Sequence, residues 1–453
     1  MNLSRFFARR VARKSWSFDQ GVCANFILMA SSLTPYSKRL SERLVVACWS
    51  GVLAMLSLPA FAQNVAPTVL PTGGQVVAGS ANITQTGNTL NVVQASQRAV
   101  VNWSSYNVGS QAAVVYQQPD ANSVTLNRVA GGVSASQIEG AIKANGTVVF
   151  ANPSGVTFGK TAQVDAAAVV ATTMNQTNDE FMSGKTSYSA SGGANATGKV
   201  VNRGQIKASD YVALMAPEVR NEGVVIAQGG TGNGAVALAS GSAVTLNFNG
   251  NQLVSVKVDA SAYKSLIANR RLIEAPGGAV IIAANSAAQL MASVIKNSGR
   301  ISTTSMVSHG GRIEIVAGTV TNSGTLEANA NGLSGNGGQV TIQGDVIQLT
   351  TRSNVQANAK TVGNGGKIVM MSNKKTTVAG SLSAQGGASF GNGGFIETSS
   401  HQQLSIDPSV KVSTIAPAGK AGTWLLDPYD LTIDSAAAAV ISGALQNSNV
   451  TVQ

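Results

Sequence analysis

The chain has 453 residues, of which 11% are charged, 5% are aromatic and 49 are glycine, and its formal net charge is +11. So few charges argue against a disordered tail or a coiled coil, and so few aromatic rings argue against one large compact core. A composition rich in aliphatic residues, Gly, Asn, Ser and Thr instead predicts many short strands joined by many turns.

The first 62 residues have the pattern of a secretory signal peptide. Eight basic and two acidic residues precede or border an apolar run from Leu44 to Leu58. The run is followed by small residues, and this order predicts export and then cleavage at the site formed by Ala60, Ala62 and Gln63. A membrane anchor is the alternative, which the shortness of the apolar run disfavours.

Both cysteines of the chain, Cys23 and Cys48, lie in this predicted leader. The mature chain would therefore contain no thiol and could form no disulfide. Most of the excess positive charge belongs to the leader as well. The remaining charge is spread thinly, so the sequence predicts no nucleic-acid partner.

A repeat of fixed length points to the fold. The sequence Gly-Asn-Gly-Gly occurs at 335–338, 363–366 and 391–394, a spacing of 28 residues in both steps. Alternating apolar positions lie between these copies, and period two indicates strands with one buried face. The predicted inward pairs are Val340/Ile342, Ile347/Leu349, Val355/Ala357, Ile368/Met370, Thr376/Val378, Leu382/Ala384, Ile396/Thr398, Leu404/Ile406 and Val410/Val412.

A second motif, Asn-x-Gly-x-apolar, starts at Asn202, Asn221, Asn297 and Asn322. Gly and Asn are the residues that tolerate the backbone of tight corners. Three short strands per unit with such corners predict an all-β fold, a three-faced parallel β-helix. A β-sandwich array or a propeller is the alternative, but propeller blades of about 40–50 residues fit the period poorly.

Three segments are expected to leave this pattern as short helices or turns. Ser136 and Glu139 have the spacing of a capping box that opens a short turn. Residues 287–296 place apolar side chains on one helical face, and residues 436–445 are rich in alanine after Asp434. A turn is also expected at residues 427–430, and a flexible glycine loop at residues 229–234.

A long ordered string of motifs resembles the secretion domain of two-partner secretion exoproteins, the filamentous haemagglutinin family. The string includes Gln118-Pro119-Asp120, residues 123–129, Gly131-Gly132 and the segment 145–159. In that segment Asn152-Pro153-Ser154-Gly155-Val156 matches the family's Asn-Pro-Asn-Gly-aliphatic hallmark, with Ser154 in place of the second Asn. The family's second Asn-Pro-Asn-Leu motif is not found, and residues 422–433 resemble a segment of longer members.

The resemblance implies a secreted, right-handed parallel β-helix from a Gram-negative bacterium. The chain would pass through the periplasm and be recognised by an Omp85-like outer-membrane transporter, and then act as an adhesin or haemagglutinin at the cell surface. A stalk of a contact-dependent toxin and a haem-scavenging exoprotein remain the alternatives. The receptor on a host or neighbouring cell is not identified.

The residues named by the resemblance are Asn152, Pro153, Ser154, Gly155 and Val156, as the motif that directs export. A plain β-turn is the simpler reading of this segment, since Pro and Gly suit its second and fourth positions. Its effect on export would then act through the fold or through contact with the transporter.

The sequence predicts no enzyme, cofactor or metal site. A polysaccharide lyase on a β-helix is the rival class, suggested by Glu314, Asp345 and Lys367, but no acidic cluster recurs in register. The carboxylates of Asp407, Asp427, Asp430 and Asp434 lack the spacing of a calcium loop. The two histidines, His309 and His401, fall in separate units.

The predicted organisation has four parts: a leader at 1–62, a secretion domain at 63–300, repeats of about 28 residues at 301–422, and the start of a further segment at 423–453. The sequence ends in a strand-like run without a polar cap, whereas solenoids usually cap their ends. We therefore expect the chain to be part of a longer protein.

Overall fold

The structure is a computed structural model that describes residues 65–130, 134–190, 198–229, 234–261, 265–286, 293–307 and 309–453. Within it, Val65–Gln453 forms one compact unit. The predicted cleavage site at Ala60, Ala62 and Gln63 and most of the predicted glycine loop lie outside the described residues. In the part that is described, no helix is both long and apolar enough to cross a membrane.

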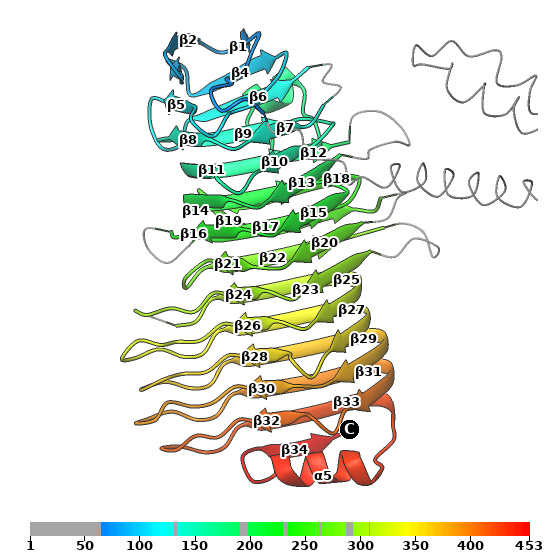
Figure 1. Ribbon diagram of the computed structural model, residues 1–453. Helices are drawn as coiled ribbons and strands as arrows, with labels where there is room; N and C mark the ends of the chain where they lie inside the picture. Colours follow the sequence, from blue (N-terminus) through cyan, green and yellow to red (C-terminus); the bar gives the residue numbers. More distant parts are fainter. Residues whose placement is uncertain are drawn as a thin grey trace, which may run out of the picture. The chain divides into compact units, whose positions relative to one another are not determined.

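The chain winds as a stack of coils whose strands pair in parallel with the strands above and below (Figure 1). Each full coil contributes one strand segment to each of three ladders, which we name faces A, B and C. The expected all-β parallel β-helix is thus confirmed, and chain order within a coil runs from face A to face B to face C.

Face A contains β4 (Arg98–Trp103), β6 (Val124–Val129), β9 (Thr147–Ala151), β11 (Gln163–Thr172), β14 (Gln205–Met215), β17 (Ala235–Ser240), β22 (Ala279–Ala284), β25 (Arg312–Asn322), β27 (Gln339–Leu349), β29 (Lys367–Val378), β31 (Phe395–Ile406), β33 (Thr423–Leu431) and β34 (Asn449–Val452). Face B contains β7 (Ser136–Ile138), β10 (Val156–Phe158), β13 (Lys199–Asn202), β15 (Glu218–Asn221), β20 (Leu266–Asn269), β23 (Val294–Asn297) and the second halves of β25, β27, β29 and β31.

Face C contains β3 (Thr89–Gln94), β5 (Ala113–Gln117), β8 (Ala141–Ala144), the first halves of β11 and β14, β16 (Val224–Ala227), β21 (Leu272–Glu274), β24 (Arg300–Ser302), β26 (Thr325–Glu327), β28 (Asn354–Gln356), β30 (Ser381–Ser383) and β32 (Lys411–Ser413). The first coil is covered by β1 (Gln75–Ala78) and β2 (Ala81–Thr86), which pair antiparallel with β4 and β3. Antiparallel pairing closes this end of the stack, as a solenoid requires.

The core of the stack consists of small aliphatic side chains from all three faces. The alternating pairs expected from the sequence point inward: Val340, Ile342, Ile347, Val355 and their counterparts one and two units later are buried, and Ile406 is partly buried. The register between units is also as expected, because Val340, Ile368, Ile396 and Trp424 pair in one line across β27, β29, β31 and β33.

The recurring glycines are required by the close approach of one coil to the next. A Cβ atom on Gly366 would overlap the carbonyl oxygen of Gly338, and one on Gly394 would overlap that of Gly366. Any larger residue would push adjacent backbones apart. The Gly-Asn-Gly-Gly period therefore marks the corner at which each coil enters face A.

The Asn-x-Gly motif forms a ladder of buried side chains at the corner between faces B and C. Four asparagines donate from Nδ2 to Oδ1 of the asparagine one coil further on, at 2.7–2.9 Å, and the last, Asn322, donates to the hydroxyl of Ser353 at 2.6 Å. The members are Asn202, Asn221, Asn269, Asn297 and Asn322, all buried. The motif missed Asn269, because Arg271 stands where the other copies have glycine.

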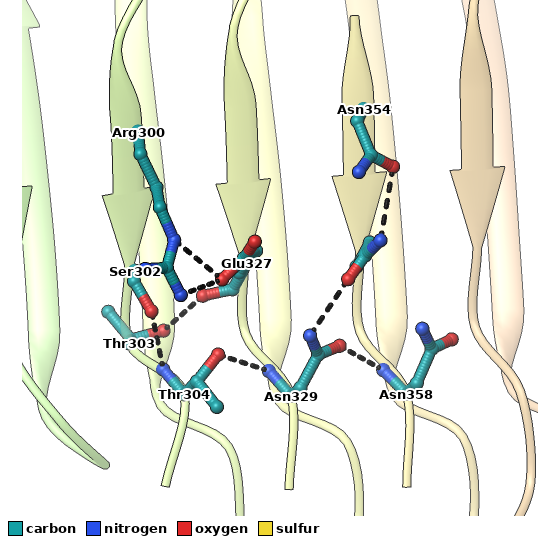
Figure 2. A network of polar contacts seen from close by, with 9 residues as sticks. Arg300, Ser302, Thr303, Thr304, Glu327, Asn329, Asn354 and Asn358 are labelled. Atoms are coloured by element: carbon teal, nitrogen blue, oxygen red, sulfur yellow. Dashed lines mark hydrogen bonds and ion pairs between the residues drawn. The ribbon is translucent and has the colours of Figure 1, made fainter. Parts of the chain in front are cut away.

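Long loops connect face C to face A in the later coils and stack on one another. Figure 2 shows how side chains join successive coils here: in the loops, Asn358 donates its backbone N–H to Oδ1 of Asn329 at 2.8 Å, and on the preceding strands Arg300 of β24 donates to Glu327 of β26 at 2.6 Å. The bond to Glu327 raises the pKa of the Arg300 guanidinium. These links run along the stack and fix the spacing of successive loops.

Two excursions cover face A of the earlier coils. They comprise α4 (Asn178–Met182) and the antiparallel strands β12 (Ser187–Ser189), β18 (Ala243–Asn249) and β19 (Gln252–Asp259). Val244, Leu246 and Leu253 of the hairpin pack on Val170 and Ala237, which point outward from the solenoid and form a second core.

Three local expectations were wrong, and one was confirmed. Ser136–Ile138 is a strand because it pairs with β10, and Glu139 accepts a bond from Thr161 instead of capping a turn. Of the helix expected at 287–296, residues 287–292 lie outside the described residues, and Val294–Asn297 is a strand that continues face B. Residues 427–430 lie in β33, paired irregularly with β31, because the ladder extends through them. The predicted alanine-rich helix is α5 (Ser435–Ala444), capped by Asp434.

Candidate functional site: a turn anchored by a buried asparagine

The five residues Asn152–Val156 connect β9 on face A to β10 on face B. Asn152 is 1% exposed and Val156 is fully buried, whereas Pro153 is exposed and Ser154 is half-buried. The segment therefore has a buried base and an exposed tip. It lies on the coil that precedes the first excursion.

The backbone of this segment closes as a β-turn. The N–H of Gly155 donates to the carbonyl oxygen of Asn152 at 2.9 Å, and the N–H of Ser154 donates to Oδ1 of Asn152 at 2.9 Å. The second bond is an Asx-turn, in which the side chain copies a backbone turn. Because it uses the backbone of residue 154, it does not depend on the Ser side chain that replaces the family's Asn.

The side chain of Asn152 also binds the preceding coil. Its Nδ2 group donates to the Ser136 hydroxyl at 3.0 Å and to the Ser134 carbonyl oxygen at 3.1 Å. Its backbone N–H donates to the carbonyl oxygen of Thr172 on the next coil at 3.0 Å. Asn supplies both a donor and an acceptor at this short reach, which Asp and Ala cannot do.

Gly155 is the residue that the backbone geometry demands. Its φ angle is +120°, a region that residues with a Cβ atom rarely adopt. A Cβ there would also lie 2.8 Å from the carbonyl oxygen of Lys199. The carbonyl of Gly155 accepts from the N–H of Ser136, so this residue too joins the turn to its neighbour.

An aromatic and polar network lies inside the same coils. The Tyr106 and Tyr116 hydroxyls lie 2.6 Å apart, and Oδ1 of Asn127 accepts from Tyr116 at 2.8 Å and from Trp103 at 3.1 Å. Burial raises the pKa of both tyrosines. Phe150, two residues before Asn152, packs on Tyr106 with ring centroids 5.3 Å apart.

The sequence missed the partners of the turn. Ser134, Ser136 and Thr172 come from two other coils, and no local pattern shows that they contact Asn152. The alternating strand pattern of residues 134–138 was the available signal, because it places Ser136 inward beside β10.

The residues weighed for other chemistry do not form a common site. Glu314 pairs with Arg312, and Asp345 pairs with Lys374 and Asn373, whose hydrogen bond lowers the pKa of that carboxyl. Asp407 accepts a bond from Ser409 two residues later, at 2.8 Å. Among the described residues, no group of three or more His, Cys, Asp or Glu residues lies together as a metal site would need.

Comparisons with known proteins agree with this architecture. The structure aligns with the crystal structure of the HMW1 secretion domain from Haemophilus influenzae, with a TM-score of 0.62 and 24% identity. The alignment covers 79% of this chain and all of that domain. At this identity the likeness shows the fold, which is a β-helix of secretion-domain type.

The family is shown by sequence. Residues 67–328 match the family model of the TPS secretion domain, and the chain belongs to that family. A heme/hemopexin-binding protein of Haemophilus influenzae strain Rd is 37% identical over 215 residues, 46% of this chain and 23% of the relative. A second protein of that description is 38% identical over 104 residues. The chain spans less than a quarter of the length of either relative.

Membership in the TPS secretion domain family bears on where the protein is exported and on one class of partner. Two-partner secretion exoproteins are secreted across the outer membrane of Gram-negative bacteria, and the family implies a dedicated outer-membrane transporter. The names of the matched proteins describe secretion and binding and do not describe an enzyme.

Proposed function

We propose that the coils around Asn152–Val156 are the export signal, read by an Omp85-like outer-membrane transporter. The observation that carries the proposal is the family match over residues 67–328, because it contains this turn together with Ser134, Ser136 and Thr172. The exposed tip, Pro153, is the part available to a partner in the folded state.

The turn acts in export in one of two ways. In the first, the transporter reads the exposed tip. In the second, the bonds from Asn152 to adjacent coils start folding outside the cell and so draw the chain outward. Coil-by-coil folding suits the second, since each coil needs its neighbour as template.

Secretion with and without the cognate transporter tests the proposal. We expect transporter-dependent release of the mature chain, and release reduced about tenfold or more by Asn152→Ala. Asn152→Asp keeps the Asx-turn acceptor but loses the Nδ2 donor. Pro153→Ala changes the tip alone. If Asn152→Asp abolishes release while Pro153→Ala is released normally, the turn acts through folding. If Pro153→Ala abolishes release while Asn152→Asp is released normally, the transporter recognises the tip.

The matched control is Asn247→Ala, since Asn247 is exposed on β18 and its Nδ2 donates to Ser255 at 3.1 Å. Its release should equal that of the unchanged chain. Release that does not require the transporter, or equal release of Asn152→Ala, would contradict the proposal.

We further propose that the end use of the secreted protein is adhesion, without catalysis. The similarity to heme/hemopexin-binding proteins favours the haem-scavenging alternative. Adherence of transporter-expressing cells and retention of the secreted chain on hemin-agarose and hemopexin separate these uses. Depolymerisation of a polysaccharide by the purified chain would reinstate the lyase reading.

We also propose that the export domain ends near residue 300 and that residues 301–422 are a repeat shaft, with a further segment starting at residue 423. Chains truncated after residue 300 and after residue 328 test that boundary by their release. Equal release of both chains supports a boundary near residue 300. Release of the longer chain alone places the boundary between residues 300 and 328.

A further inference from the structure

The five long loops that lead from face C to face A in the later coils project from the stack (Figure 1). They are residues 303–311, 328–338, 357–366, 384–394 and 414–422. In residues 303–307 and 309–422, every exposed large apolar side chain except Met371 lies in one of these loops. Because these side chains are exposed, they contribute little to the burial that stabilises the stack.

The exposed apolar side chains lie at the middle of each loop, which we name the loop tip. Val307 and Leu333 are each 86% exposed, and Phe390 is 68% exposed. Met306 and Val362 are exposed as well. Four successive loops therefore present at least one large apolar side chain at the tip.

Backbone pairing holds the loop tips in a row. Ser334 forms a parallel bridge with Val362, and Val362 forms one with Phe390. The N–H of Gly363 donates to the carbonyl oxygen of Phe390 at 2.8 Å, and Leu333 stands one position beside this line. Paired strands lie about 4.8 Å apart, so four loop tips form a row about 15 Å long that runs along the stack.

The charges of the loops have one sign. The five loops contain no aspartate or glutamate, whereas they contain Lys360 and Lys420, which are both exposed. Glu327, which precedes the second loop, is paired with Arg300. The loop tips thus combine apolar side chains with nearby cations, which suits a surface that is anionic outside and apolar beneath.

The size and charge of the row disfavour a protein as the occupant. A stable interface between proteins covers about 800 Å² on each partner, and a row one side chain wide and about 15 Å long covers far less. A second copy would also bring Lys360 and Lys420 of both chains together, with no acidic residue in the loops to pair with them. A bilayer needs no matching shape, because apolar side chains enter below the headgroups while lysines remain among them.

We propose that the loop tips bind a phospholipid bilayer that carries anionic headgroups. Val307, Leu333 and Phe390 enter the boundary between headgroups and acyl chains, and Lys360 and Lys420 contact the phosphate groups. Since the row runs along the stack, these coils lie along the membrane surface.

Co-sedimentation of the purified mature chain with vesicles tests the proposal. Vesicles of phosphatidylcholine and phosphatidylglycerol supply the anionic surface, and vesicles of phosphatidylcholine alone are the comparison. We expect tighter binding to the mixed vesicles than to the neutral ones. Added salt should weaken the binding to the mixed vesicles, because it screens exposed charges.

Two double variants test the apolar side chains. Leu333→Ser/Phe390→Ser should weaken binding to the mixed vesicles about tenfold or more. Tyr429→Ser/Ile433→Ser removes two exposed apolar side chains outside the loops and should change binding less than about twofold.

A second pair of double variants tests the charges. Lys360→Gln/Lys420→Gln should weaken binding to the mixed vesicles about tenfold at low salt and leave binding to neutral vesicles unchanged. Lys143→Gln/Lys375→Gln removes two exposed cations outside the loops and should change neither.

Insertion has a direct optical signature. Trp103 and Trp424 are buried, so an indole introduced by Phe390→Trp reports on the loop tip as the exposed fluorophore. We expect its emission to shift to the blue on mixed vesicles and to be quenched by brominated lipids. An indole introduced by Tyr429→Trp should show neither effect.

Three results would overturn the proposal. They are no binding to the mixed vesicles, equal weakening by the two apolar double variants, and self-association that Leu333→Ser/Phe390→Ser abolishes without any binding to vesicles. The last would assign the loop tips to a second copy of the chain. Circular dichroism and melting temperature confirm that each variant keeps the fold. The test uses purified chain and lipid alone, so its result is independent of the proposals on export and adhesion.

Discussion

Asn202, Asn221 and Asn269 occupy one position in three successive coils, yet 19 residues separate the first two and 48 separate the second two. In the later coils, Asn336, Asn364 and Asn392 are separated by 28 residues at each step. In the earlier region, the residues outside the three strands of a coil form excursions that cover face A. In the later region, they form loops of equal length that stack on one another.

The two regions also differ in what is buried. The earlier coils have two cores, one inside the solenoid and one between face A and the excursions, and they contain the buried tyrosines and the asparagine ladder. The later coils have the inner core, and the ladder line continues there with Leu349 beside Asn322. A regular coil therefore depends on its two neighbours, whereas an earlier coil depends also on a specific cover.

The largest expected effect comes from deletions that contrast the two regions. Removing residues 242–259 deletes the β18–β19 hairpin, and the cut ends lie close together because Gly241 approaches the carbonyl of Asp259. The deletion would expose the outward apolar side chains of face A, including Val170 and Ala237. We expect aggregation or binding of a hydrophobic dye, measured by size-exclusion chromatography and fluorescence.

The matched deletion removes residues 340–367 and joins Gln339 to Ile368. The register is kept because Gln339 is equivalent to Lys367, the residue that precedes Ile368. It takes out one whole coil without changing the register of the rest. We expect a soluble, folded chain with one coil fewer and a modest loss of stability. A repeat deletion that aggregates while the hairpin deletion stays folded would reverse the comparison.

Alkaline pH should separate the regions next. Tyr106, Tyr116 and Tyr188 are buried in the earlier coils, and burial raises the pKa of each phenol well above its ordinary value. Their stabilising effect is complete below about pH 10, where the unfolded chain keeps them protonated, and is lost as the pH rises further. Above that pH, each buried tyrosine lowers the free energy of unfolding by about 1.4 kcal/mol per pH unit. Among residues 312–453 the one tyrosine, Tyr429, is 89% exposed.

Two tryptophans report on the regions separately. Trp103 lies buried in the earlier coils and Trp424 in the later ones. In Trp424→Phe and Trp103→Phe variants of the mature chain, the remaining fluorescence follows one region each. We expect the Trp103 signal to change at lower pH than the Trp424 signal. A single shared transition would show that the regions unfold as one.

The fold of the later coils could be predicted well from the sequence. Successive coils there have the same length, so the contacts between them recur at a fixed period and alternating apolar residues mark the buried positions. Val340, Ile347 and Val355 could be assigned to three faces without any long-range knowledge. The earlier region was predicted through family resemblance, and its local patterns misled. Ser136 and Glu139 match a capping box, but the strand pairing of β7 with β10 overrides that local preference.

The candidate turn was located but its anchoring was not. Asn152 and Gly155 have recognisable turn chemistry, whereas the hydroxyl of Ser136 and the carbonyl of Thr172 reach Asn152 from coils 16 and 20 residues away. Such partners depend on how many residues each coil contains, and no fixed period marks that number in this region of the sequence.

The smallest expected effect tests the asparagine ladder that joins the two regions. Asn221→Ala removes the bond that Asn221 donates to Asn269 at 2.8 Å and the acceptor used by Asn202 at 2.9 Å, so that both buried neighbours lose one hydrogen bond. We expect a loss of about 2–3 kcal/mol in the free energy of unfolding, measured by urea denaturation. Asn247→Ala, at an exposed position on β18, should cost less than about 0.5 kcal/mol. Equal losses of free energy in the two variants would mean that the ladder sets the register of the coils without stabilising them. The later coils, which have Leu349 at the position of the ladder, would then differ from the earlier coils only in how their side chains pack.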